Sequence, residues 1–138
     1  MKNILIKSDR FIIKNIKLIN VNSEYFKWFK QKDIKRFIKL SDYESLDSLR
    51  KYVMKMKIKS NVIFLAIFTK KGIHIGNIKF ENINTKKSSS TMGILIGEKK
   101  WRGRGATPEV IEACAHWLYK NLDIRKIFLG VSKYNVSA

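Results

Sequence analysis

The sequence predicts an α+β fold, or a mixed-sheet α/β fold, in a single domain over residues 1–138. A chain of 138 residues has the size of one ordinary domain. Apolar residues recur every three or four positions in two segments, which is the spacing of a helix that buries one face. Short runs of β-branched and aromatic residues beside them predict strands. The expected order is β-α-α-β-β-β-α-β, and its last strand–helix–strand unit should be a right-handed crossover between parallel strands.

The N-terminal part should supply one strand and two short helical pieces. Residues 9–14 predict a strand with an apolar centre. The pair Asn22-Ser23 offers an N-cap for a following helix. Residues 33–38 predict a second helical piece. The first helix carries an aromatic stripe that we expect in the core, made of Tyr25, Phe26, Trp28 and Phe29.

The middle of the chain should change from helix to sheet. Residues 41–44 have the S-x-x-E form of a capping box, which predicts the start of a helix. That helix should end near Lys59, and its apolar face should be Leu46, Leu49, Val53 and Met56. Residues 62–68 and 74–83 then predict an antiparallel hairpin, with a turn at residues 70–72.

The C-terminal part should continue the sheet and add one long helix. Residues 84–90 predict a polar loop, and residues 92–97 predict a third strand of this group. Pro108 stands where a first helical turn tolerates proline best, so a helix should run from there to about Tyr119. A further strand is expected at residues 127–131. One face of the helix should hold Val110, Cys114 and Trp117, with Ile111 and Leu118 beside them.

The charge balance is strongly basic. Lysine and arginine number 29 against 11 acidic residues, which gives a net charge of +18. Residues 1–80 carry 19 basic and 6 acidic side chains, and residues 81–138 carry 10 and 5, so the excess is not a basic tail. Such a field attracts polyanions, among them nucleic acid, acidic lipid surfaces and phosphorylated small molecules. A codon bias toward Lys, Ile and Asn is the alternative source of part of this charge.

The cysteine and apolar patterns exclude several classes of protein. The single cysteine, Cys114, cannot form an intramolecular disulfide and is expected to be a small core side chain. His74 has no partner pattern and His116 should be exposed, so no metal site is expected. The apolar runs fall short of the roughly 20 residues that a membrane span needs, and the N-terminus does not have the pattern of a signal peptide. These features predict a cytoplasmic protein without a membrane segment.

The segment with the most chemistry is the loop at residues 99–107, which places two glycines among four cations. Glycines let successive main-chain N–H groups point into one concavity, and the following helix adds free N–H donors and a positive dipole end. These features favour a diphosphate site. The spacings of the nucleoside-triphosphate loop and of the dinucleotide fingerprint are both absent. The alternative is an ordinary strand-to-helix loop that binds nothing.

Seven segments occur in an order that is informative as a set. They are residues 9–14, Trp28 with residues 32–34, residues 75–78, 92–97, 102–107 (Arg-Gly-Arg-Gly-Ala-Thr), 108–111, and 131–138 with Asn135. In this order they resemble the RimJ/RimL-like branch of the GNAT superfamily of acetyl-coenzyme A-dependent N-acetyltransferases. Residues 102–107 are similar to its R/Q-x-x-G-x-G/A motif. The resemblance covers nearly the whole chain and implies a GNAT-like, mixed and largely antiparallel sheet flanked by helices, with a C-terminal parallel βαβ unit.

The resemblance also implies site residues. Acetyl-coenzyme A would be the co-substrate, with no metal, and a main-chain N–H within residues 94–96 would stabilise the developing oxyanion. Glu81 is the candidate base for the amine, and its alternative role is an exposed carboxylate at a strand end. Asn135 would contact the pantetheine arm or hold the strand end. The other coenzyme contacts would come from Ile94, Leu95, Ile96, Arg102, Gly103, Arg104, Gly105, Ala106 and Thr107.

Two departures from the family pattern leave several functions open. Thr107 stands where the motif usually has Gly or Ala, and the sequence stops at Ala138, where the family continues with a helix that carries a catalytic Tyr and with two closing strands. The expected activity is acetyl transfer to a primary amine, either the amino group of a nucleotide-activated sugar or a protein N-terminal amine. The alternatives are an incomplete coenzyme-binding pseudoenzyme and a basic nucleic-acid-binding module, against which the absence of a nucleic-acid motif speaks. A second copy of the chain in a homodimer could complete the sheet.

Overall fold

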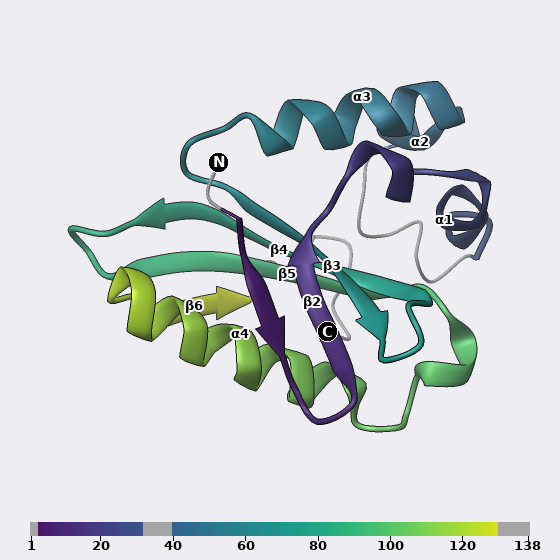
Figure 1. The fold of residues 1–138 in the computed structure, drawn as a ribbon. Coiled ribbons are helices and arrows are strands. Elements are labelled where there is room, and N and C mark those ends of the chain that lie inside the picture. The colour runs from purple at the N-terminus through teal and green to yellow at the C-terminus, as the bar shows by residue number, and fades with distance from the viewer. Residues whose placement is uncertain (1–2, 32–39, 130–138) are drawn as a thin grey trace.

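The computed structural model describes residues 3–31 and 40–129, which form a six-stranded sheet with helices on both faces (Figure 1). This architecture confirms the predicted α+β fold. The strands are β1 (Leu5–Lys7), β2 (Phe11–Asn15), β3 (Ile63–Thr69), β4 (His74–Asn84), β5 (Ser89–Ile96) and β6 (Lys126–Leu129). The helices are α1 (Ser23–Trp28), α2 (Leu40–Tyr43), α3 (Leu46–Lys57) and α4 (Ala106–Leu122), with 3-10 turns η1 (Leu18–Asn20) and η2 (Lys99–Trp101).

The strands lie in sequence order across the sheet, β1-β2-β3-β4-β5-β6. The first five pair antiparallel with their neighbours, and β6 pairs parallel with β5. This last pairing is the parallel strand–helix–strand unit that the sequence predicts, because α4 connects β5 to β6. Figure 1 shows α4 on one face of the sheet and the α1–α3 segment on the other.

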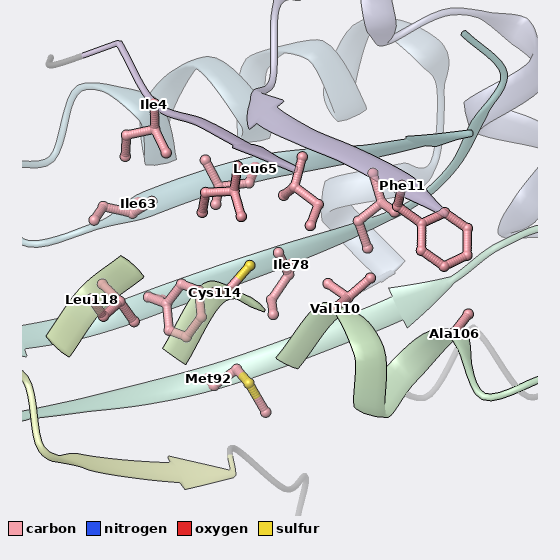
Figure 2. Packing of buried hydrophobic residues seen from close by; sticks show 14 of the residues in the cluster. Ile4, Phe11, Ile63, Leu65, Ile78, Met92, Ala106, Val110, Cys114 and Leu118 are labelled. Atoms are coloured by element: carbon pink, nitrogen blue, oxygen red, sulfur yellow. The ribbon is translucent and has the colours of Figure 1, made fainter. Parts of the chain in front are cut away.

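The face covered by α4 holds one of the two hydrophobic clusters (Figure 2). Val110, Cys114 and Leu118 recur every four residues, so their side chains lie on one side of α4 and are at most 1% exposed. They pack over sheet residues such as Ile78 and Met92. Burying a side chain of the size of Val or Leu stabilises the fold by roughly 1.5–3 kcal/mol. The prediction that Cys114 is a core side chain is confirmed.

The opposite face carries a second hydrophobic cluster, rich in aromatic residues, to which α1, α3 and β3 contribute. The Tyr25 ring lies 5.0 Å from the Trp28 ring and 5.7 Å from the Phe29 ring, measured between centroids. Three of the four aromatic residues predicted for the core are therefore buried, and Phe26 is partly buried. The predicted N-cap is also present, since the Asn22 side chain accepts a hydrogen bond from the Tyr25 N–H at 3.1 Å.

Some predicted boundaries were wrong. The capping box lies at Ser45 and Ser48, because the Ser predicted as the cap, Ser41, is inside the short helix α2. Ser89 and Ser90 belong to β5 and not to a loop, because they pair with Lys126 and Ile127 of β6. Strand β1 was not predicted at all, and α4 extends past both of its predicted ends. The helical piece expected at residues 33–38 lies outside the described residues.

The described residues contain neither a membrane-spanning helix nor a metal-binding cluster. In residues 3–31 and 40–129, no helix is long and apolar enough to cross a membrane. Within the same ranges, no group of three or more His, Cys, Asp or Glu side chains could hold a metal ion.

Candidate functional site

The loop between β5 and α4 turns on two glycines in the left-handed conformation. The η2 turn opens it, with the Trp101 N–H donating to the Glu98 carbonyl at 3.0 Å. Gly103 then has φ 72° and Gly105 has φ 76°, values that a residue with a Cβ adopts at a cost of about 1–2 kcal/mol. Gly105 is also the N-cap of α4, and no side chain supplies the cap hydrogen bond.

This turn leaves a row of main-chain donors. The five consecutive N–H groups from Gly103 to Thr107 donate to no residue that the structure describes. Pro108 has no N–H, and the first intrahelical bond runs from the Glu109 N–H to the Gly105 carbonyl at 3.3 Å. The 17-residue helix α4 adds the positive end of its dipole at the same place. Free N–H groups and a positive helix end together fit a diphosphate.

The Arg102 side chain binds groups of the protein itself, although its charge and its place in the loop suggest a contact with the diphosphate. Its Nε donates to the Ile96 carbonyl at 3.0 Å, and its Nη2 donates to the Gln31 side-chain oxygen at 2.8 Å. The guanidinium therefore joins the end of β5 to the chain just after α1. The neighbouring Arg104 and both glycines are exposed, and Ala106 is buried.

The end of α1 fixes the start of the loop. A Cβ on Gly97 would lie 2.0 Å from the Trp28 ring, so the indole packs directly on the Gly97 main chain. The Trp28 Nε1 donates to the Glu98 carboxylate at 3.2 Å, and the Gln31 amide donates to the Gly97 carbonyl at 2.9 Å. Sequence reasoning missed Trp28 and Gln31 as supports of the loop, because their partners lie about 70 residues away.

Near the loop, the main-chain N–H and carbonyl of Ile94 lie on the edge of β5 that faces away from β4. The Gly97 N–H donates to the Ile75 carbonyl at 2.8 Å, and main-chain groups alternate in direction along an antiparallel pair. The groups of Ile94 and Ile96 therefore point away from β4. The described pairing with β6 ends at Leu129, opposite Met92, so Ile94 lies beyond it.

Glu81 lies inside β4 and not at its end, and its carboxylate is paired. Its Oε1 is 3.0 Å from the Lys79 Nζ, and Lys79 also donates to the Tyr52 hydroxyl of α3. Burial lowers the pKa of Lys79, but the Tyr52 hydroxyl and the Glu81 carboxylate outweigh it and hold this pKa above its ordinary value. Lys79 is therefore charged at neutral pH. The role of Glu81 as a base stays a prediction.

His74 has a partner that the sequence pattern did not show. Its Nε2 lies 2.7 Å from the Asn77 side-chain oxygen, and its ring meets the Trp28 ring edge-on at 4.9 Å. Residues 74 and 77 would face opposite sides of a regular strand, but the register shifts beside Phe68 and brings them together. Burial lowers the pKa of His74, and the hydrogen bond to Asn77 offsets part of this effect. The ring is neutral at pH 7, so it does not add to the positive charge.

The other predicted contacts are divided between the core and the surface. Leu95 and Ile96 pack in the two clusters on opposite faces of the sheet, and Ile94 is partly buried beside α4. Thr107 is half-buried in the first turn of α4. Asn135 lies outside the described residues. His116 is exposed, as predicted.

A family model described as the acetyltransferase (GNAT) domain matches residues 10–138. The chain belongs to the GNAT acetyltransferase family. The chain is therefore, by family membership, an acetyl-coenzyme A-dependent N-acetyltransferase, in agreement with the resemblance found in the sequence. Among curated proteins, none matches.

Solved structures of GNAT acetyltransferases share its fold. One is an acetyl transferase from Salmonella typhimurium that modifies the N-terminal serine of ribosomal protein L7/L12; it has a TM-score of 0.77 at 16% identity, over 91% of this chain and 74% of its own. RimL, a ribosomal L7/L12 N-acetyltransferase in complex with coenzyme A, has a TM-score of 0.78 at 15% identity, over 91% and 73%. A spermidine N-acetyltransferase chimera from Vibrio cholerae and hSSAT has a TM-score of 0.74 at 18% identity, over 91% and 72%. These likenesses support a RimJ/RimL-like fold.

Proposed function

We propose that this GNAT protein transfers the acetyl group of acetyl-coenzyme A to the primary amine of a nucleotide-activated amino sugar or of a protein N-terminus. The observation that carries the proposal is the row of main-chain N–H groups from Gly103 to Thr107, which donate to no described residue. The coenzyme diphosphate supplies acceptors of the right charge for these donors. RimL, which is similar in fold, is known in complex with coenzyme A.

The residues around the loop have separate tasks in this proposal. The N–H groups of residues 103–107 hold the diphosphate, and the main chain of Ile94 lies beyond the described pairing of β5 with β6, where the thioester can reach it. Its N–H can stabilise charge that develops on the thioester oxygen. The amine nitrogen attacks the carbonyl carbon of the thioester, the carbon–sulfur bond breaks, and coenzyme A leaves as a thiolate that takes up a proton from water.

The acceptor amine has to lose a proton before it attacks. An alkylammonium has a pKa of about 10, so it is almost wholly protonated at neutral pH. We assign the task of accepting this proton, directly or through water, to Glu81 on β4. The ion pair with Lys79 holds the Glu81 carboxylate in place at 3.0 Å.

The charge of the chain favours an anionic acceptor. The net charge of +18 attracts a substrate that carries its own diphosphate and repels a polycation. The Glu81 carboxylate is paired with Lys79, so it offers little attraction to a polyamine such as spermidine. Of the two proposed acceptors, we therefore favour the nucleotide-activated amino sugar.

A transfer assay with a panel of amines tests the proposal. The protein is incubated with acetyl-coenzyme A and a nucleotide-activated amino sugar, a peptide with a free N-terminal amine, or spermidine, and thiol release is measured. We expect turnover with the sugar first and the peptide second, and none with their N-acetylated forms, which serve as matched controls. Coenzyme A binding by calorimetry without turnover of any amine would contradict acetyl transfer, and a lack of binding would contradict the whole proposal.

A further inference from the structure

A network of hydrogen bonds joins the N-terminal hairpin to the first turn of α4. The Glu109 carboxylate accepts from the Ser8 hydroxyl at 2.6 Å, from the Arg10 N–H at 2.8 Å and from the Arg10 Nε at 2.6 Å. Burial raises the pKa of Glu109, but the hydrogen bonds from Ser8 and Arg10 outweigh it and hold this pKa below its ordinary value. The carboxylate is therefore charged, and it is directed at the hairpin.

The Arg10 guanidinium continues from this network to the diphosphate loop. Its Nη1 donates to the Arg104 carbonyl at 2.9 Å, between the two left-handed glycines. Its Nη2 lies 3.6 Å from the place that a Cβ on Gly105 would take. Among the described residues, Nη2 has no hydrogen-bond acceptor, and 36% of the Arg10 side chain is exposed.

This arrangement divides the three nitrogens of one side chain among three tasks. Nε is held by Glu109, Nη1 holds the main chain of the loop, and Nη2 is left beside the free N–H groups. An arginine pairs readily with phosphate oxygens, and its planar shape lets one ion pair fix the direction of its other donors. The hydrogen bonds from Ser8 and Arg10 also keep the negative charge of Glu109, in the first turn of α4, directed away from a bound anion.

We propose that Arg10 is part of the diphosphate site, holding the loop through the Arg104 carbonyl and offering Nη2 to a diphosphate oxygen of the coenzyme. This inference rests on the proposed function, because it assumes that the diphosphate binds the N–H groups of residues 103–107. It adds a residue from a hairpin that lies almost 100 positions away from the loop in the sequence. Nothing in the loop motif itself points to this residue.

The test compares ligands with and without the diphosphate. Calorimetry measures the binding of coenzyme A and of pantetheine, which lacks the diphosphate and the nucleotide. In Arg10→Met the dissociation constant for coenzyme A should rise about 10- to 100-fold, the size of a lost charge-assisted hydrogen bond, while that for pantetheine stays within about twofold. The KM for acetyl-coenzyme A should rise by a similar factor, with kcat nearly unchanged.

Two further variants separate the contact from a purely structural role. Lys7→Met removes the same charge from an exposed position of the same hairpin and should leave both ligands unaffected. Arg10→Lys keeps the charge but not the planar fork, so its loss of coenzyme affinity should be smaller than that of Arg10→Met. If Arg10→Met does not fold, Arg10→Lys compared with Lys7→Met carries the same test.

Failure of the proposed function and failure of the inference about Arg10 give different results. If the natural protein does not bind coenzyme A, the proposed function is wrong, whatever Arg10 does. If it binds and the Arg10 variants bind equally well, only the inference about Arg10 is overturned. If affinity for pantetheine and the melting temperature fall in step with affinity for coenzyme A, Arg10 supports the fold alone and the inference is again overturned.

Discussion

The two ends of α4 differ in whether the main-chain N–H groups beside them have hydrogen-bond acceptors in the protein. At the C-terminal end, Asp123 adopts the left-handed conformation with φ 54°, and its N–H donates to carbonyls of the last turn, that of Leu118 included. At the N-terminal end, Gly105 is also left-handed, but no side chain caps the helix and the N–H groups of residues 103–107 donate to no described residue. The C-terminal end satisfies itself, whereas the N-terminal end requires a ligand or water.

Side chains from other elements hold the N-terminal end of α4, here called the open end, and this support distinguishes it from a frayed helix terminus. Arg102 holds the end of β5, Trp28 packs on Gly97, and Arg10 holds the Arg104 carbonyl. A loop that is fixed before the ligand arrives loses less conformational freedom on binding. The unpaired donors therefore lie on a loop whose main chain is already held in place, as the proposed coenzyme site requires.

The largest expected effect comes from placing a negative charge at the open end. Gly105→Asp puts a carboxylate into the cradle and beside Arg10, so affinity for coenzyme A should fall by about 100-fold or more. Asp tolerates the left-handed φ of 76° better than most residues do, so the melting temperature should change little. Calorimetry and thermal unfolding measure the two effects.

Gly105→Asn is the matched control for this variant. Asn has nearly the same shape and tolerates the left-handed conformation as Asp does, but it brings no charge. We expect it to lose a smaller part of the affinity. Equal affinity of both variants and the natural protein for coenzyme A would show that the open end of α4 is not the binding site.

The next largest effect is expected where Trp28 packs on Gly97 and so supports the loop before α4; it does not involve the N–H donors of residues 103–107. Gly97→Ala would place a methyl group 2.0 Å from the Trp28 ring, so α1 would have to move. Overpacking of this kind costs about 1–3 kcal/mol of unfolding free energy. Gly93→Ala, four residues earlier in β5, is the control, since a Cβ there meets nothing within 4 Å. Urea unfolding of both variants measures the difference, and equal midpoints would contradict the packing argument.

The sequence allowed prediction of the open end but not of what holds it. The two glycines of residues 103–107 and Pro108 indicate a loop that enters a helix, because glycine and proline have strong local preferences. The contacts of Trp28 with Gly97 and of Arg10 with Glu109 join residues about 70 and 99 positions apart. A local pattern carries no information on such pairs.

The fold follows the same division between local and distant interactions. Spacing predicted a helix at α4 and most of the apolar stripe of α3, because helix periodicity is a local property. The predicted ends of α4 were wrong, and Trp117, expected on the same face as Cys114, is only partly buried. Strand β1 was missed, since its three residues gain their pairing from β2 and only Ile6 is buried, on the α4 face of the sheet. His74 met Asn77 only through a register shift against β3, which single-sequence reasoning could not locate.

A smaller effect is expected when the carboxylate at the open end is neutralised. Glu109→Gln should lower the free energy of unfolding at pH 7 by about 1–2 kcal/mol, because it weakens hydrogen bonds to a charged group. The pKa of Glu109 is lowered in the fold, so its contribution is complete above the unfolded pKa of about 4.3 and is lost as pH falls through the folded pKa. Urea unfolding across pH should show the two proteins converging in acid. A gap that stays constant would contradict the role of the charge.

The smallest effect is expected at the C-terminal end of α4, where Asp123 already has its acceptors within the helix. Asp123→Gly removes the strain of a non-glycine residue at φ 54° and the exposed ion pair with Arg125 at 3.1 Å, which contributes little. The free energy of unfolding should rise by no more than about 1 kcal/mol, because glycine also gains freedom in the unfolded chain. Affinity for coenzyme A should not change, since the Asp123 N–H already has its acceptors within α4. A change in affinity as large as that of Gly105→Asn would mean that the two ends of α4 do not have separate roles.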